Sequence, residues 1–291
     1  MKLDAILSDD PRARDDALAA VASAPEHERS ALASKLAAAA REAADALATA
    51  EETGEATDPH EARVGRACVA LSRLRVELAR TALLRIADEG TRSVKSALAE
   101  ALRGTTTTEG RAVLVHLLSD DEARPDAILA IGAAPWPEVV PALIEVAEAD
   151  DQAAQLAIAA IARCGASGGP KELNAAVDFL LELLDEDVAF APAIGALLRL
   201  GVAIPAVVPR AKRLTKEPGT RKVAGLYLLA AFGDEGNASF LELALSGTKT
   251  DEDAARTFLE PLLTDADARV RTAAERTWRA FDLSHVSAPS R

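Results

Sequence analysis

The stretch TDADARVRTAAERTWRAF, residues Thr264–Phe281, carries the pattern that decides the fold. Counting from Val270, small or apolar side chains and one threonine recur three, four, seven, eight and eleven residues later, the last being Phe281. Because an α-helix completes a turn about every 3.6 residues, this spacing places them on one face of a helix. Asp265 or Asp267 can accept backbone N–H bonds at the start of that helix, where negative charge also suits the helix dipole. The stretch therefore predicts an amphipathic helix with an acidic start.

The same pattern recurs at regular intervals along the chain. Copies begin at residues 64, 94, 124 and 154, which are 30 residues apart, and further copies begin at 14, 190 and 223. An acidic turn such as SDDE (Ser119–Glu122) precedes most copies. A second apolar helix is expected in the intervals, at 76–87, 109–118, 137–149, 171–184 and 204–216. Periods of about 20 to 50 residues are typical of stacked repeats, so the chain is expected to be a repeat protein.

Prolines and glycines mark the ends of these helices. Pro141 and Pro209 should bend their helices or make them start late, because proline cannot donate a backbone hydrogen bond. Helices often end at a glycine with left-handed backbone, and glycines fall near the ends of five successive helices: Gly104, Gly132, Gly165, Gly201 and Gly233. The helix boundaries therefore follow the same period as the apolar pattern.

Two irregular inserts, at about 25–57 and 234–252, break this register. The first holds an alanine-rich helix at 26–49 and then the acidic segment EETGEATDP, residues 51–59, which we expect to be a mobile loop. The second is expected to border short helices near 237–245 and 252–263. We predict a single domain over residues 1–283 and a flexible C-terminal tail at 284–291.

The composition favours an all-α protein in a reducing compartment. Apolar residues make up 49% of the chain and aromatic residues only 3%, and alanine, the best helix former, is abundant. The net charge of -13 disfavours a free-standing nucleic-acid binder, which needs basic residues against phosphates. The two cysteines, Cys68 and Cys164, are far apart, with Cys68 expected in the core and Cys164 closer to the surface. No apolar run reaches the length of a membrane span, so we expect a cytoplasmic protein without a membrane partner.

Three stretches carry a resemblance to a known family. LLTDADARVRTAAERTW (Leu262–Trp278) has a turn with Asp followed by a helix that begins with Val-Arg, and ILSDDPRARDDALAAVA (Ile6–Ala22) and DEGTRSVKSALAEAL (Asp88–Leu102) match it more loosely. In these features the chain resembles the HEAT-repeat family. The resemblance implies a right-handed α-solenoid of about eight helical hairpin repeats. It also implies that Arg271 pairs with Asp265, and Lys95 with Asp88, in a structural role.

Such a solenoid would present an extended concave surface, so we expect a non-enzymatic scaffold or adaptor that binds a protein partner. Residues 199–222, the basic island, hold seven basic residues and one acid between acidic stretches. They either bind an acidic partner surface or are paired by neighbouring repeats. Trp136, between two prolines, is either a hydrophobic staple or an exposed anchor. The candidate partner-binding residues are Trp136, Arg199, Arg210, Lys212, Arg213, Lys216, Arg221 and Lys222.

No catalytic residue, cofactor or metal ligand is predicted, because the chain lacks a phosphate loop, a nucleophile elbow and an HExxH motif. Two His-Glu pairs, at His27 and His60, are similar to those of the HEAT-like deoxyhypusine hydroxylases, which have four. One alternative is therefore a HEAT-like enzyme, such as a bilin lyase or a metal-dependent hydroxylase. Another is nucleic-acid binding through the basic island, as in the HEAT-like alkylpurine glycosylases.

Overall fold

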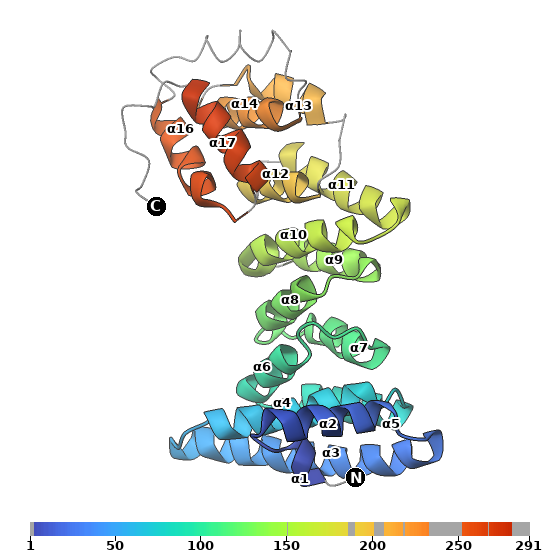
Figure 1. The fold of residues 1–291 in the computed structure, drawn as a ribbon. Coiled ribbons are helices and arrows are strands. Elements are labelled where there is room, and N and C mark those ends of the chain that lie inside the picture. Colours follow the sequence, from blue (N-terminus) through green and yellow to red (C-terminus); the bar gives the residue numbers. More distant parts are fainter. Residues whose placement is uncertain are drawn as a thin grey trace. The chain divides into compact units, whose positions relative to one another are not determined.

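The computed structural model describes residues 3–149, 151–185, 190–200, 207–217, 219–232, 252–266 and 268–280. Every regular element within these ranges is a helix, which confirms the all-α prediction (Figure 1). The chain divides into two compact units, residues 1–160 and 161–291. The single domain expected over residues 1–283 stays a prediction.

The first unit consists of two layers of helices. Its elements are α1 (Leu3–Ile6), α2 (Pro11–Ala22), α3 (Glu26–Thr53), α4 (Asp58–Arg73), α5 (Glu77–Glu89), α6 (Arg92–Ala101), α7 (Thr108–Leu117), α8 (Arg124–Ala133), the 3-10 turn η1 (Pro137–Val139), α9 (Val140–Ala149) and the start of α10 (Asp151–Ala166). In one layer, which we call the first layer, α2, α4, α6 and α8 contact one another in that order. In the second layer α3, α5 and α7 do the same and pack against the first. Helices one repeat apart are therefore neighbours.

The second unit is centred on α14 (Thr220–Phe232). Its other elements are the end of α10, α11 (Pro170–Asp185), α12 (Phe190–Arg199), α13 (Val207–Leu214), α16 (Glu252–Leu259), the 3-10 turn η3 (Pro261–Thr264) and α17 (Ala268–Ala280). The buried Tyr227 of α14 meets Phe258 edge to face, with ring centroids 5.9 Å apart. Its hydroxyl donates to the Val270 carbonyl over 3.4 Å. This aromatic cluster joins α14, α16 and α17.

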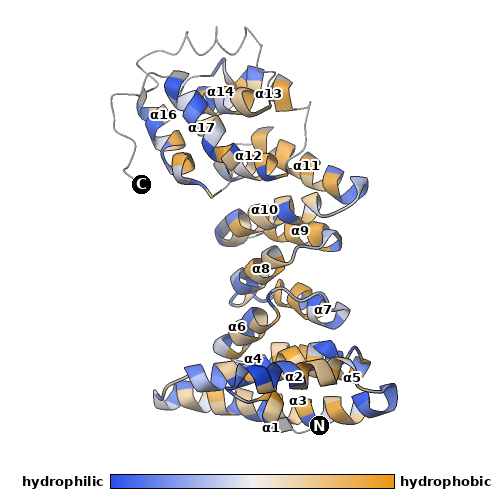
Figure 2. Cartoon of the chain, viewed as in Figure 1, coloured by the Kyte–Doolittle hydropathy of each residue, from blue (hydrophilic) through white to orange (hydrophobic). Residues whose placement is uncertain are grey.

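The repeated apolar pattern forms the core. Val64, Cys68, Leu71 and Leu98 are all buried, and in Figure 2 apolar and polar residues alternate around the helices as an amphipathic pattern requires. Burial raises the pKa of the Cys68 thiol to about 12. Cys164 is also buried, so the expectation that it lies near the surface was wrong: it faces inward on the last turn of α10.

Several helices begin or end at other residues than the sequence predicted. The loop expected at 51–59 is shorter than predicted and spans residues 54–57, because α3 continues to Thr53 and α4 begins at Asp58. Gly54, with φ of 72°, provides the left-handed residue that ends α3. The late start predicted near Pro141 is confirmed, since the 3-10 turn precedes α9. In the second unit α13 begins at Val207, so Pro209 lies in its first turn.

The predicted helix ends fall in three groups. Gly104 has a left-handed backbone, with φ of 79°, just past the end of α6. Gly132 and Gly165 instead lie inside the last turns of α8 and α10. Gly201, Gly233, the helix expected near 237–245 and the tail at 284–291 lie outside the described residues. None of the helices that the structure describes is long and apolar enough to cross a membrane.

Candidate functional site

A hollow of about 710 Å³ lies on the first layer, between α2, α4 and α6. We call it the α4 groove. Helix α4 supplies the largest share of its lining, with residues spaced so that they share one helical face: Asp58, Glu61, Ala62, Gly65, Arg66 and Val69. Helix α2 adds Arg14 and Leu18, and α6 adds Ser93, Ser96, Ala97, Glu100 and Ala101. The groove thus combines one face from each of three neighbouring helices.

Small residues leave the space of the groove open. Ala62 of α4 is exposed, and Ala97 and Ala101 of α6 are partly exposed. An added Cβ at Gly65 would lie 3.4 Å from the Cβ of Ala101 and 3.9 Å from the Ala97 carbonyl oxygen, so α4 and α6 are already in contact there. Larger side chains at these positions would fill the hollow. This run of small residues on half-exposed positions is the sequence signal that could have indicated the groove.

The charged residues of the groove differ in whether their side chains already bond to other parts of the protein. Arg66 donates to the Leu7 carbonyl over 2.9 Å and to the Asp9 carboxylate over 2.6 Å, and its side chain is only 19% exposed. Asp58 and Glu61 form no side-chain hydrogen bond or ion pair with any other residue that the structure describes. Arg66 is therefore a structural link, whereas the two carboxylates are free to bind.

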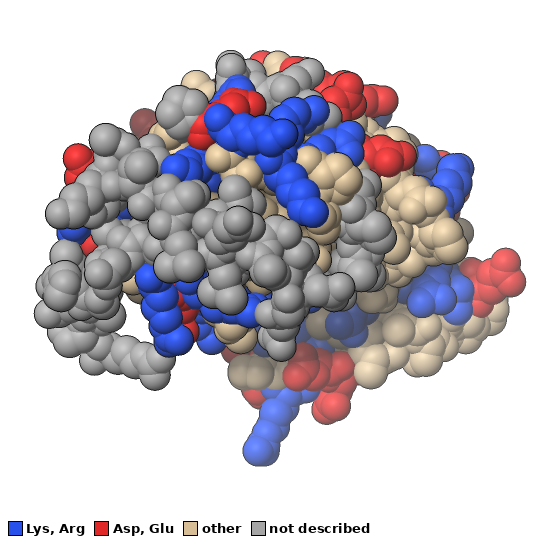
Figure 3. All heavy atoms as spheres, turned by 90° about the horizontal axis from the view of Figure 1, so that it is seen from above, with Lys and Arg blue, Asp and Glu red and all other residues tan. Residues whose placement is uncertain are grey.

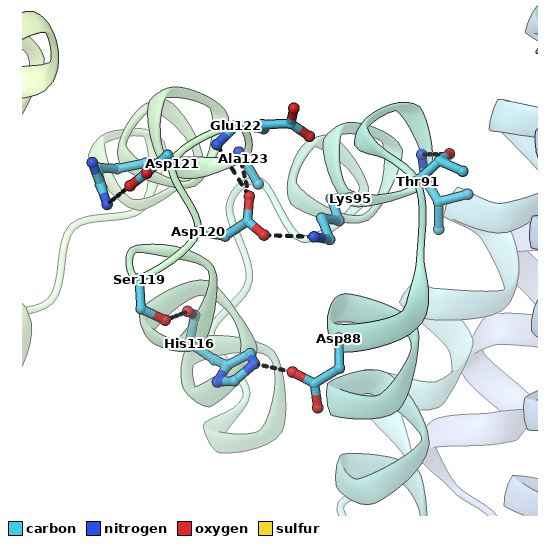
Figure 4. A network of polar contacts seen from close by, with 11 residues as sticks. Asp88, Thr91, Lys95, His116, Ser119, Asp120, Asp121, Glu122 and Ala123 are labelled. Atoms are coloured by element: carbon cyan, nitrogen blue, oxygen red, sulfur yellow. Dashed lines mark hydrogen bonds and ion pairs between the residues drawn. The ribbon is translucent and has the colours of Figure 1, made fainter.

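A polar network beside the groove links α6 to the elements that follow it (Figure 4). Lys95 Nζ lies 2.5 Å from the Asp120 carboxylate, which also accepts the backbone N–H groups of Glu122 and Ala123 over 3.1 and 3.0 Å. The hydrogen bond from Lys95, together with the two backbone bonds, lowers the pKa of Asp120 against the opposing effect of burial. Asp120 thus caps the turn before α8 and holds that turn to α6.

The predicted pairing of Lys95 with Asp88 was wrong. Asp88, at the end of α5, instead lies 2.6 Å from Nε2 of His116, near the end of α7 (Figure 4). Lys95 is on α6, and α6 packs against α8, so the acid within its reach belongs to the turn that precedes α8. Charges in these turns therefore join one repeat to the next.

The predicted pairing of Arg271 with Asp265 occurs through the backbone of Asp265 and not through its carboxylate. Arg271 Nη1 donates to the backbone carbonyls of Asp265 and Ala266, over 2.6 and 2.8 Å. The Asp265 carboxylate instead accepts from Arg199 Nη2 over 2.6 Å. Arg271 thus closes the turn before α17, while Asp265 joins that turn to the end of α12.

The basic island is partly paired within the second unit. Arg199 pairs with Asp265, and Arg221 pairs with Glu217 over 2.5 Å. Arg210, Arg213 and Lys222 also have interaction partners. Lys212 and Lys216 are exposed on or just after α13 and form no side-chain bond with another described residue. On the face shown in Figure 3, basic and acidic side chains lie beside each other rather than forming a purely basic surface.

Trp136 is not an exposed anchor. Its side chain is 5% exposed and lies under the guanidinium of Arg111, whose central carbon is 5.0 Å from the ring centroid. The indole sits at the entry to η1 and α9, where it packs against the protein's own side chains. Trp136 therefore offers almost no surface to a partner.

No group of three or more His, Cys, Asp or Glu side chains that could hold a metal ion occurs among the described residues. His27 lies 3.7 Å from Glu28, and both side chains are largely exposed. No model of a protein family matches the chain, and no curated protein is similar to it. The α4 groove is consequently the strongest candidate for a binding site.

Proposed function

We propose that this protein is a non-enzymatic scaffold or adaptor, built as a right-handed HEAT-like α-solenoid, that binds a protein partner in the α4 groove. The solenoid is supported by contacts that repeat with the sequence period. Ser96 of α6 donates to the carboxylate of Asp126 of α8, which lies 30 residues later. In stacked repeats, equivalent positions of successive units lie side by side, as these two residues do.

The main support for the proposed function is the groove itself. It is lined by small side chains, and its residues Asp58 and Glu61 form no side-chain bond with another described residue. Residues that stabilise a solenoid recur in each repeat, whereas Gly65 has Lys95 and Pro125 at the positions 30 and 60 residues later. A hollow that belongs to one place in the repeat array is best explained as a binding site.

Photocrosslinking in the organism of origin tests this function. A benzophenone amino acid at position 97, in the groove, should give a discrete adduct with another protein. The additional substitution Ala62→Trp should abolish that adduct, because Ala62 is exposed and a large ring there would fill the groove without disturbing the core.

The matched control is Ala38→Trp, at an exposed alanine of α3 in the second layer. This control should keep the adduct. Absence of any protein adduct from position 97, or its survival in the Ala62→Trp variant, would reject the groove as a protein-binding site. A small molecule labelled at position 97 would instead favour the HEAT-like enzyme.

A further inference from the structure

We propose that the partner segment in the α4 groove is basic, and that its lysine or arginine side chains pair with Glu61 and Glu100. This inference rests on the proposed function and names the chemistry of the partner. It differs from one of the two readings of the basic island, in which that island would meet an acidic partner.

The charge that remains available in the groove is mainly negative. Of its two arginines, Arg66 is already bonded to Asp9 and to a backbone carbonyl, so only Arg14 is left to attract an anion. Asp58 and Glu61 have no partner among the described residues, and Glu100 has only a loose contact with Arg103, at 3.3 Å between two exposed side chains. An acidic segment would repel these carboxylates, and an apolar one would take them out of water without replacing their hydrogen bonds, so both are unfavourable.

Glu100 lies at an unfavourable position for an acid on its helix. Acids in the first turn of α4, such as Asp58 and Glu61, favour the helix because they face the positive end of its dipole. Glu100 lies in the last turn of α6, where a negative charge faces the negative end of the dipole and opposes helix formation. The helix dipole therefore does not account for Glu100, and its loose ion pair with Arg103 leaves the exposed carboxylate accessible to a cationic partner.

The basic island, the other surface considered for a charged partner, is less available than the groove. The basic island is partly paired inside the second unit, with Arg199 and Arg221 held by Asp265 and Glu217. The whole chain carries a net charge of -13, so its field attracts cationic partners and repels anionic ones. Both effects favour a basic segment in the groove over an acidic partner at the basic island.

A random dodecapeptide display library, selected on the full-length protein, tests this charge preference. Groove-dependent peptides are those enriched on the wild type and not on the Ala62→Trp variant. These peptides should be rich in lysine and arginine. The double substitution Glu61→Gln and Glu100→Gln should weaken the binding of such a peptide by about tenfold or more, because two close ion pairs are removed.

The matched control is Glu52→Gln with Glu55→Gln, which removes the same two charges from exposed residues beyond the groove. This control should change the affinity by less than about threefold, since neither residue lines the groove and exposed charges are screened by salt. Groove-dependent peptides that are neutral or acidic, or equal losses in the two double variants, would overturn the basic-partner proposal but leave the groove as a binding site. If no groove-dependent peptide appears and the position 97 adduct is also absent, the proposed function itself fails.

Discussion

Individual polar residues in this protein link elements that are distant in sequence. Lys95 reaches Asp120 across 25 residues, His116 reaches Asp88 across 28, and Ser96 reaches Asp126 across 30. Each bond spans close to one repeat, because neighbouring helices within a layer are about one repeat apart. Such links fix the register between helices, which the nondirectional hydrophobic contacts of the core specify less sharply.

The Lys95–Asp120 pair should be the most sensitive of these links. Asp120→Asn should lower the free energy of unfolding near neutral pH by about 1 kcal/mol, since a half-buried charged hydrogen bond is lost. The folded pKa of Asp120 lies below its ordinary value of 3.8, so the pair stabilises the fold above that value and less as the pH falls through the folded pKa. Urea unfolding of the wild type and the variant should therefore give stabilities that differ near neutral pH and converge as the pH falls below about 4. A difference that is constant over this range would contradict the role of the Asp120 carboxylate.

At the scale of the element, helix α6 contributes side chains both to the core and to the α4 groove. Val94, Leu98 and Leu102 are buried and hold the helix to the core, whereas Ala97 and Ala101 are half-exposed and form part of the groove. The periodicity of the sequence placed all five in one apolar stripe. The structure divides that stripe, because α4 meets the edge of α6 at Gly65 and leaves the two alanines at the opening.

Leu98→Asp tests the assignment of the buried edge of α6. It should lower the free energy of unfolding by about 4 kcal/mol, because it places an unpaired carboxylate at a fully buried position. The matched control is Leu129→Asp on α8, where the leucine is 50% exposed and the change should stay within about 0.5 kcal/mol. Thermal melting followed by circular dichroism measures both. Similar melting temperatures for the two variants would show that the assigned register of α6 is wrong.

At the scale of the whole molecule, the contacts that follow the sequence period are those of the first unit. The first unit stacks helices one repeat apart in each of two layers, and this pattern supports the proposed solenoid. A solenoid is extended, because each repeat contacts only its neighbours.

Small-angle X-ray scattering tests that proposal directly. A compact chain of 291 residues would have a radius of gyration of about 19 Å, and the proposed solenoid should exceed this value clearly. A measured radius close to the compact value, for a monomer at low concentration, would exclude an extended array.

Much of the local structure could be predicted, whereas the candidate site could not. The late start of α9 and the left-handed end at Gly104 follow from the chemistry of proline and glycine within a few residues. Specific contacts were predicted less well. Lys95 pairs with Asp120 and not with Asp88. Arg271 donates to the backbone carbonyl of Asp265 and not to its carboxylate. Trp136, which the sequence allowed either as a hydrophobic staple or as an exposed anchor, is buried under Arg111. In each case the type of residue is visible in the sequence, but the group that it meets is set by the fold.

By itself the sequence determined that the described residues are helical and that Val64, Leu71 and Leu98 belong to the core, because helix propensity and a period of about 3.6 residues are local properties of the chain. Only the tertiary structure decided that Arg66 is bonded to Asp9, that the basic island is partly paired, and that a groove opens over Gly65. These outcomes depend on the distance and rotation between helices. The periodicity of one helix does not specify either quantity, because both are set by how side chains from different helices fit together.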